Sequence, residues 1–499
     1  MKSLSTVALL ASRAAASSSC KPYVDSEKLQ SLINLDDLLA GSQKLQDFAD
    51  ANGGNRAFGG GGHNATVDWL YDTLQATGYF DVVKQPFVEL FSAGSATLTV
   101  AGEEFTPGVM TYSPATDGTV SAPIVAVSNL GCNVADYPST VSGSIALILR
   151  GTCSFAIKAA NAKTAGAVGA IVYNNIEGAV AGTLGGAGDY APVVGIPQSE
   201  GNAILAALET GEVTGDLFVT SILENRTNFN VIAETKQGDK DNVLVLGGHS
   251  DSVFAGPGIN DDGSGTIGVW AVAKALTHFK IKNAVRFAFW GAEEFGKLGS
   301  FYYVKQLNQT EDEIAKIRAY LNFDMIASPN YVLGVYDGDG GAFNFSGPAG
   351  SAQIEKDFEE FYTANGQAFV PSVFSGRSDY AGFIENGIPS GGLFTGAENI
   401  KTAEEAALFG GEAGVAYDVN YHKAGDTIDN LNTDAFLLNT KSIANSVAKY
   451  AISWDSLPPV DLAKRRWSAD HHRALNSARS THGHDHAHAG PCGQGKDLI

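Results

Sequence analysis

The sequence predicts an α/β protein with a mixed, mostly parallel β-sheet flanked by helices and a small α/β module inserted into the chain. Two observations support this class. After residue 225 of the 499-residue chain, apolar runs of strand length alternate with helix-length runs, as in sheets covered by helices on both faces. Between residues 111 and 224, short strands surround one helix, and glycine-rich connections separate them. Hydrophobic residues make up 44% of the chain, which is enough for large cores.

The individual elements follow from the apolar pattern in chain order. Residues 29–80 look helical on both sides of a glycine-rich break, and a strand is expected at 82–91. Beyond residue 225 we expect strands at 241–248, 284–291, 319–326 and 388–394, and helices at 266–279, 351–366 and 435–453. The chain is therefore divided into the N-terminal part of the main domain (20–110), the inserted module (111–224), the rest of the main domain (225–456) and a His-rich tail (457–499), which its polar composition predicts to be disordered.

The first residues, MKSLSTVALLASRAAASSSC, predict a secretory signal peptide over residues 1–19. Possible N-glycosylation sites agree with export and lie at Asn64, Asn225, Asn308 and Asn344. We therefore expect a secreted glycoprotein, with the vacuolar lumen as the alternative location.

Cysteine usage also favours an oxidising compartment. Cys132 and Cys153 lie 21 positions apart within the module, as a local disulfide would, and we prefer this pairing. A terminal pair of Cys20 with Cys492 is possible, because four cysteines allow three connectivities and the sequence does not choose among them.

Charge and hydropathy exclude two classes of partner. Lys and Arg number 33 against 54 Asp and Glu, for a formal charge of −21, and such an acidic surface repels nucleic-acid phosphates. An uninterrupted apolar window long enough to span a membrane is absent from the sequence. We expect a monomer that binds no nucleic acid and has no membrane span.

Histidine and carboxylate residues recur where expected strands end or loops begin. They are, in chain order, His249, Asp261, Glu293, Glu294, Asp324 and His422. Ligands of open α/β sheets bind at the carboxyl ends of the strands, so these groups should converge there. Carboxylates gathered in one cleft are too costly without a cation. Imidazole and carboxylate without cysteine suit zinc, with manganese, cobalt or iron also possible, and the set fits two ions if one carboxylate bridges them.

The motifs GGHSDSV, GPGINDDGSG, WGAEEFG, YLNFDMI and NYHKAGDT together resemble the M28 family of zinc exopeptidases. More closely, they resemble the fungal secreted and vacuolar leucine aminopeptidases of the aminopeptidase Y type. The likeness covers residues 29–453, and within the module the stretch 142–175 resembles a protease-associated (PA) domain. The resemblance implies the zinc exopeptidase fold with an inserted PA domain.

The same resemblance implies a ligand for each of two zinc ions. His249 and Asp324 would bind one ion, Glu294 and His422 would bind the other, and Asp261 would bridge them. Two histidines and three carboxylates thus account for the cofactor, two zinc ions per chain.

Further roles are implied around these ligands. Glu293 would be the general base, Asp251 would orient the imidazole of the first ligand, and Tyr421 would stabilise the tetrahedral intermediate. Arg377, in FSGRSDYAGF, would contact the substrate. The Asp261–Asp262 peptide bond is expected to be cis.

Strand alternation supplies a reason for the Glu293–Glu294 pair. If both residues end the strand at 284–291, their side chains point to opposite faces. Glu294 would then face the metal and Glu293 the reacting water. His63 and His278 lack metal-like neighbours in the sequence and are expected to be structural or surface residues.

The function implied by the resemblance is a secreted dizinc aminopeptidase that removes N-terminal residues, leucine or other apolar ones, from peptides with a free amino end. An M28-type carboxypeptidase is the alternative with the same metals, but it would need several basic groups to hold a substrate carboxylate. A non-catalytic, receptor-like relative is the third interpretation. The PA-like module is expected either to cap the main domain or to control access to the cleft.

Overall fold

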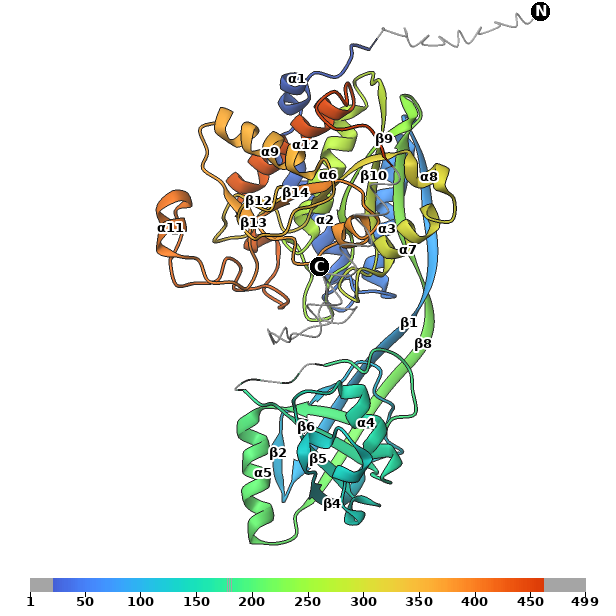
Figure 1. The fold of residues 1–499 in the computed structure, drawn as a ribbon, viewed down its shortest axis with the longest axis vertical. Helices are drawn as coiled ribbons and strands as arrows, with labels where there is room; N and C mark the ends of the chain where they lie inside the picture. The colour runs from blue at the N-terminus through green and yellow to red at the C-terminus, as the bar shows by residue number, and fades with distance from the viewer. Residues whose placement is uncertain (1–20, 177, 179, 181, 462–499) are drawn as a thin grey trace, which may run out of the picture.

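The computed structural model describes residues 21–461 except 177, 179 and 181. It forms two lobes that are joined by two very long neighbouring strands, β1 (Phe80–Val100) and β8 (Thr214–Thr235) (Figure 1). These strands pair antiparallel over their whole length, from Phe80 opposite Thr235 to Val100 opposite Gly215. The larger lobe is the main domain and the smaller one is the inserted module.

The main domain contains a mixed sheet, as the sequence predicts. Its central strands run parallel to one another, whereas β8 pairs antiparallel with β10 and β12 antiparallel with β14. The strand order is β13-β12-β14-β11-β9-β10-β8. The bounds are β9 (Asp239–His249), β10 (Asn283–Trp290), β11 (Ile317–Phe323), β12 (Gly334–Tyr336), β13 (Val370–Ser372) and β14 (Ser390–Phe394).

Both faces of this sheet are buried, because successive side chains of a strand point to opposite sides. In β9, Leu244 and Leu246 belong to one apolar core, and Val243 and Val245 belong to the other. Burial on both faces explains why the strands are continuous apolar runs in the sequence.

Helices cover each face. The first face packs against α1 (Ser26–Ser31), α2 (Leu35–Asp50), α3 (Gly61–Ala76), α6 (Gly263–Leu276), α9 (Ser351–Ala364) and α12 (Thr433–Tyr450). The second face packs against α7 (Leu298–Leu307), α8 (Glu311–Ala315) and α10 (Tyr380–Ile384). A short helix, α11 (Ala403–Phe409), lies at the left edge of the main domain in the view of Figure 1.

The module is a smaller α/β unit at the end of the β1–β8 ribbon. Its parallel strands are β4 (Val120–Ala126), β5 (Ile145–Leu149), β6 (Gly169–Tyr173) and β7 (Val193–Ile196). The other elements are β2 (Glu103–Phe105), β3 (Gly108–Val109), α4 (Phe155–Thr164) and α5 (Gln198–Thr210). Short 3₁₀ helices are η1 (Asn129–Gly131), η2 (Val134–Asp136) and η3 (Ser139–Val141) here, and η4 (Ile428–Asn430) in the main domain.

The outer halves of β1 and β8 belong to the core of the module. Leu98 and Leu217 are buried there, whereas Phe87 and Phe91 pack against Phe58 of the main domain. We therefore propose that the module comprises residues 92–223. Compared with the segment 111–224 expected from the sequence, these bounds add the outer half of β1 with β2 and β3, and leave out residue 224.

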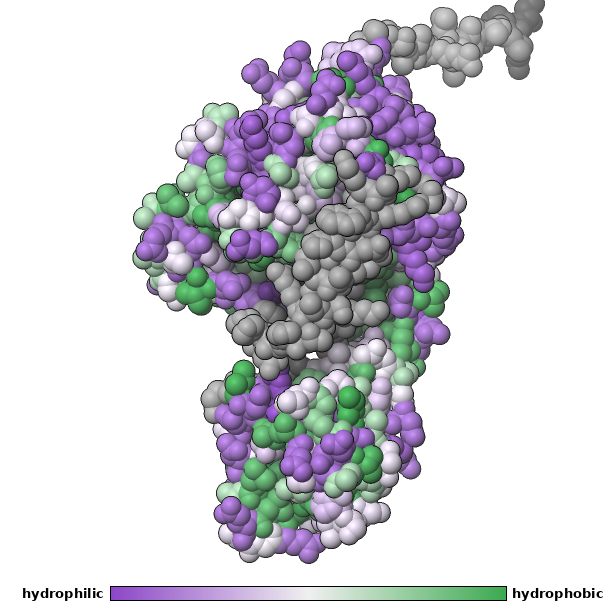
Figure 2. Space-filling view, viewed as in Figure 1, coloured by the Kyte–Doolittle hydropathy of each residue, from purple (hydrophilic) through white to green (hydrophobic). Residues whose placement is uncertain are grey.

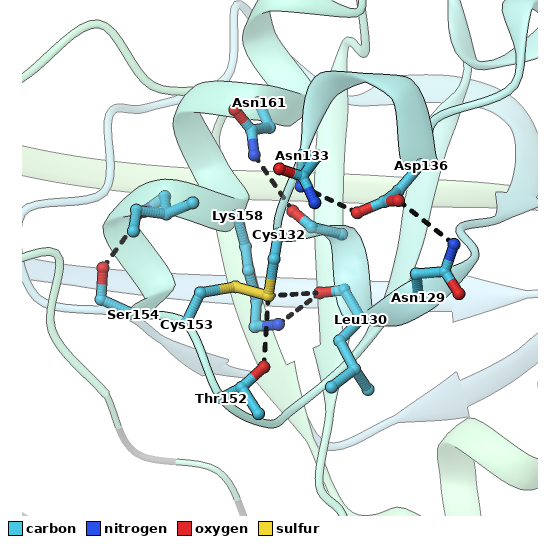
Figure 3. Close-up of a disulfide and its surroundings, with 12 residues drawn as sticks. Asn129, Leu130, Cys132, Asn133, Asp136, Thr152, Cys153, Ser154, Lys158 and Asn161 are labelled. Atoms are coloured by element: carbon cyan, nitrogen blue, oxygen red, sulfur yellow. Dashed lines mark hydrogen bonds between the residues drawn. A yellow bond between two sulfur atoms is a disulfide. The ribbon is translucent and has the colours of Figure 1, made fainter. Parts of the chain in front are cut away.

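A disulfide joins Cys132 and Cys153 within the module, as the sequence suggests (Figure 3). Beside it, the buried ammonium of Lys158 donates to the carbonyl oxygen of Leu130. Burial lowers the pKa of this lysine to about 8. The possible pair of Cys20 with Cys492 lies outside the described residues, as do the expected signal peptide and nearly all of the His-rich tail.

Hydrophilic residues cover most of the upper part of the main domain in the view of Figure 2. The side chains of all four sequon asparagines, Asn64, Asn225, Asn308 and Asn344, are exposed. Across the described residues, every helix is too short or too polar to cross a lipid bilayer.

Candidate metal centre

Five of the residues singled out from the sequence meet at the carboxyl ends of the central strands. The Nε2 atom of His249, the last residue of β9, lies 3.1 Å from Asp261 Oδ1 and 3.7 Å from Asp324 Oδ1. On the other side, His422 Nε2 lies 3.2 Å from Asp261 Oδ2 and 3.1 Å from Glu294 Oε2. Asp261 therefore presents one carboxylate oxygen to each histidine.

These side chains form two groups of possible ligands that share one carboxylate. The first group is His249, Asp261 and Asp324, and the second is Asp261, Glu294 and His422. Within each group the ligand atoms lie within 4.8 Å of one another. Nitrogen and oxygen donors of this kind suit zinc, and the shared aspartate suits a bridge between two neighbouring ions. The residues present fit a pair of zinc ions.

Burial of the carboxylates supports the same conclusion. Burial raises the pKa of both Glu293 and Glu294, so their ionised forms are unfavourable in the protein alone. Burial would also raise the pKa of Asp261, but its interactions with His249 and His422 outweigh that effect and lower it. Bound cations would balance this buried negative charge.

The backbone around the centre explains the glycines of the GGHSDSV motif. A side chain at Gly248 would collide with Asp262 Oδ2 and with the carbonyl oxygen of Phe323. The carboxylate of Asp262 accepts the N–H groups of His249, Gly265 and Met325, and so caps α6 and joins three segments. Asp262 is thus a structural residue, and the Asp261–Asp262 peptide is cis, as the resemblance implies.

The surroundings of Glu293 and Glu294 correct the explanation drawn from strand alternation. Strand β10 ends at Trp290, and both glutamates lie in the turn that follows. Ala292 has a positive φ of 59°, so the chain has left the extended conformation before either glutamate. The two carboxylates differ in position because of this turn, not because of the two-residue period of a strand.

Two further carboxylates hold the centre in place. Asp251 Oδ1 accepts the N–H of Glu293 at 3.0 Å and lies 3.6 Å from His249 Nδ1. Asp426 accepts the N–H groups of Asn260 and Asp261. Sequence reasoning identified the first of these and missed Asp426, although it lies in the NYHKAGDT motif four residues after His422.

A cleft of about 120 Å³ opens beside the centre. Cleft volumes of roughly 300–1,000 Å³ are typical for drug-sized ligands, so this one suits a single side chain. Its apolar wall consists of Met325, Tyr336, Val373, Tyr380, Phe394 and Ala397, and its polar wall includes Asp261, Glu293, Asp324, Arg377 and Tyr421. Arg377 is expected to contact the substrate and Tyr421 to stabilise the intermediate. Both therefore face the same space as the candidate metal ligands Asp261 and Asp324.

Among the described residues, the remaining histidines are His63 and His278, and both lie outside the two ligand groups. His63 is buried in α3, and its Nε2 lies 2.9 Å from the hydroxyl of Ser250. Burial lowers the pKa of His63 to about 4, so it is neutral at pH 7. His278 is exposed near the end of α6. Both have structural or surface positions, as expected.

A third acidic group was not expected from the sequence. It consists of Asp337, Asp339 and Glu355, whose oxygens also lie close enough together to hold an ion. However, Asp337 accepts three backbone N–H groups and Glu355 accepts two, from residues of the loop 338–343. These backbone donors account for the gathering of carboxylates without a cation.

Comparison with known proteins agrees with this geometry. The model of peptidase family M28 matches residues 230–447, and that of the PA domain matches residues 120–204. The chain is 55% identical to "Probable leucine aminopeptidase 2" of Aspergillus fumigatus over 484 residues, which is 96% of this chain and 95% of that protein. It is 56% identical to "Leucine aminopeptidase 2" of Arthroderma otae over 440 residues, 88% of each chain.

Solved structures give the same result. The aminopeptidase from Aneurinibacillus sp. strain AM-1 has a TM-score of 0.67 and 28% identity, covering 88% of this chain and 97% of that one. The zinc aminopeptidase BSAP of Bacillus subtilis has a TM-score of 0.64 and 25% identity, covering 84% and 95%. The chain therefore belongs to peptidase family M28 and is a metalloaminopeptidase with an inserted PA domain.

Proposed function

We propose that this enzyme is a secreted dizinc aminopeptidase that removes apolar N-terminal residues, leucine among them, from peptides with a free amino group. The observation that supports this proposal most strongly is the pair of ligand groups that share Asp261 at the base of a small apolar cleft. Two relatives above 50% identity are named as leucine aminopeptidases, and one similar solved structure is a zinc aminopeptidase.

The proposed ligands follow the two groups. His249 and Asp324 hold one zinc ion, Glu294 and His422 hold the other, and Asp261 bridges them. Zinc supplies Lewis acidity at such a centre, which polarises a peptide carbonyl and makes water nucleophilic near neutral pH.

Glu293 is the proposed general base. Its carboxylate lines the cleft, and its Oε2 lies 4.0 Å from His249 Nε2, so it is beside the ligands. Glu293 takes a proton from the attacking water and delivers it to the leaving amine. Burial raises the pKa of this carboxyl, and the neighbouring cations would offset that effect, so that the ionised form can accept the proton. Tyr421, on the same cleft, donates its hydroxyl hydrogen to the oxygen that becomes negative.

The charges of the cleft favour a free amino end over a free carboxyl end. Of the carboxylates that line it, Asp261 and Asp324 are proposed zinc ligands, so Glu293 is the one that would attract an ammonium group. Among the described residues that line the cleft, Arg377 is the only basic one, and it is already paired with Glu398 at 2.8 Å. The carboxypeptidase alternative needs unpaired basic groups, so the site argues against it. The receptor-like alternative is disfavoured because every proposed ligand position carries a suitable donor.

A substrate comparison tests the proposal directly. The purified enzyme should hydrolyse leucyl-p-nitroanilide and a Leu-Gly-Gly peptide, and it should leave the N-acetylated forms of both intact. Dialysis against a chelator should abolish hydrolysis, and zinc should restore it, with two zinc ions per chain by atomic absorption. Release of the C-terminal residue from an N-acetylated peptide would instead establish the carboxypeptidase alternative, and a protein that binds zinc without hydrolysing any of these substrates would favour the receptor-like one.

A further inference from the structure

An ion pair beside the cleft joins Arg377, which lines it, to a residue with no role assigned so far, Glu398. Arg377 lies in the loop before α10, and Glu398 lies in the segment after β14. Arg377 Nη1 donates to Glu398 Oε1 at 2.8 Å, and Nη2 donates to Oε2 at 3.3 Å. This two-point contact fixes the plane of the guanidinium group as well as its position.

The same guanidinium group reaches a third segment. Its Nη2 donates to the hydroxyl oxygen of Tyr421 at 3.0 Å. The ring of Tyr421 stacks on that of His422, with ring centroids 3.8 Å apart. Glu398, Arg377 and Tyr421 therefore form a chain of hydrogen bonds that ends at Tyr421, the neighbour of a proposed zinc ligand.

The direction of these bonds matters for chemistry. Because Arg377 donates to the oxygen of the Tyr421 hydroxyl, the hydrogen of that hydroxyl is directed to a different acceptor. A hydroxyl that accepts a hydrogen bond from a cation is a stronger donor, since bonds in a chain polarise one another. The arrangement suits donation to a negative oxygen that forms in the cleft.

The ion pair has little value as a stabilising contact. The side chains of Arg377 and Glu398 are 31% and 36% exposed, and pairs so open to water contribute little to the free energy of folding. Their placement instead suits a role in orientation, because arginine has a long flexible side chain whose position one hydrogen bond to Tyr421 would not determine.

We infer that Glu398 is a positioning residue for catalysis, which aligns Arg377 and through it the hydroxyl of Tyr421 with the developing oxyanion. This inference rests on the proposed role of Tyr421 in that step. Arg377 would then act through the hydroxyl of Tyr421 in addition to its expected contact with the substrate.

A double-mutant cycle on the zinc-loaded full chain tests the inference. Tyr421→Phe should lower kcat for leucyl-p-nitroanilide by about 100-fold. Glu398→Gln should lower kcat by roughly tenfold to 100-fold with little change in KM, because it displaces a group that acts in the transition state. In the Tyr421→Phe background, Glu398→Gln should have almost no further effect on kcat.

Glu405→Gln is the matched control. Glu405 also accepts a tyrosine hydroxyl, from Tyr417 at 2.7 Å, but it lies in α11 and outside the cleft lining. This variant should keep the kcat of the parent enzyme. Zinc content and the urea midpoint of every variant separate loss of the centre or of the fold from loss of alignment.

The outcomes distinguish this inference from the proposed function. If Tyr421→Phe keeps full kcat, the proposed role of Tyr421 is wrong and the inference is overturned with it. If Tyr421→Phe loses activity while Glu398→Gln is neutral, or lowers kcat equally in both backgrounds, only the inference is overturned. A loss confined to KM would also overturn it, since Glu398 would then act in binding alone.

Discussion

At the scale of single residues, Glu293 and Glu294 are adjacent in sequence but have different neighbours. Glu294 Oε2 lies 3.1 Å from His422 Nε2, within the second ligand group. Glu293 lines the cleft, and its backbone N–H is held by Asp251. One carboxylate therefore lies among the candidate metal ligands, and the other lines the cleft beside them.

Exchange of either glutamate for glutamine should separate the two roles. Glu293→Gln should keep both zinc ions and lower kcat by about 10²–10⁴-fold, because the amide cannot accept the proton of water. Glu294→Gln should reduce zinc content as well as activity, since it removes a charged ligand. Zinc analysis and the kinetics of leucyl-p-nitroanilide hydrolysis measure both effects. A zinc-loaded Glu293→Gln enzyme with near-normal turnover would show that another group is the base.

The proposed ligands could be predicted from the sequence because each lies in a short recognisable motif, although the motif with His422 follows no strand directly. Supporting residues were harder to predict. Asp426 accepts backbone N–H groups and Glu398 accepts a hydrogen bond from an arginine, and in both cases the partners are distant in sequence. No spacing rule in the sequence connects such partners. The turn at Ala292 was also hidden, since its positive φ belongs to a residue type that rarely adopts one.

At the scale of elements, the loop between β9 and α6 carries Asp261, the proposed bridging ligand, and is held by one buried side chain. Arg56, between α2 and α3, is fully buried. Its guanidinium group donates to the carbonyl oxygens of Ser250, Pro257 and Gly258. The N-terminal helices therefore fix the shape of a loop that lies about 200 positions later in the chain.

Loss of this side chain should destabilise the enzyme strongly. Arg56→Met leaves three buried carbonyl oxygens without their donor, and each unpaired buried group costs about 1–3 kcal/mol. We expect the free energy of unfolding in urea to fall by at least about 3 kcal/mol. Arg318→Met is the control, because Arg318 also donates to a backbone carbonyl but is partly exposed. Equal losses in the two variants would contradict this role of Arg56.

The sequence predicted the type of the central elements better than their extent. Strands β9, β10 and β11 are buried on both faces, so they appear as continuous apolar runs. The full length of β1 was not predicted. Residues 92–100 contain glycine and serine, and their side chains become buried only where they pack against the module. Helix α7 was missed because it follows directly after the turn that carries the two glutamates.

At the scale of the whole molecule, the main domain and the module have separate apolar cores. Residues of the module are absent from the described lining of the cleft, and every proposed zinc ligand lies in the main domain. Ser92 of β1 pairs with Leu223 of β8, near the boundary between the two cores along these strands. The sequence predicted this division into two units, because a change in composition marks it.

Replacement of residues 92–223 by an Asn-Gly turn between Phe91 and Glu224 should leave a folded peptidase. The two residues pair across the ribbon, and Asn-Gly is a favoured two-residue connection between antiparallel strands. Zinc content and kcat for leucyl-p-nitroanilide should stay within about twofold of the full chain, since the module does not contribute to the cleft.

Comparison of a dipeptide with a 20-residue peptide then tests whether the module controls access. Unchanged rates for both lengths would favour a role as a cap, and a change confined to the long peptide would favour gating. Failure of the shortened chain to bind zinc would contradict the independence of the main domain.

The pairing of β1 with β8 has a consequence for the history of this architecture. A unit attached through two adjacent strands has its entry and exit points side by side, so its gain or removal alters neither the path nor the order of the surrounding chain. Such an attachment makes the PA domain an exchangeable cassette. Recombination at one hairpin could give the same catalytic body a different accessory unit without rebuilding its metal centre.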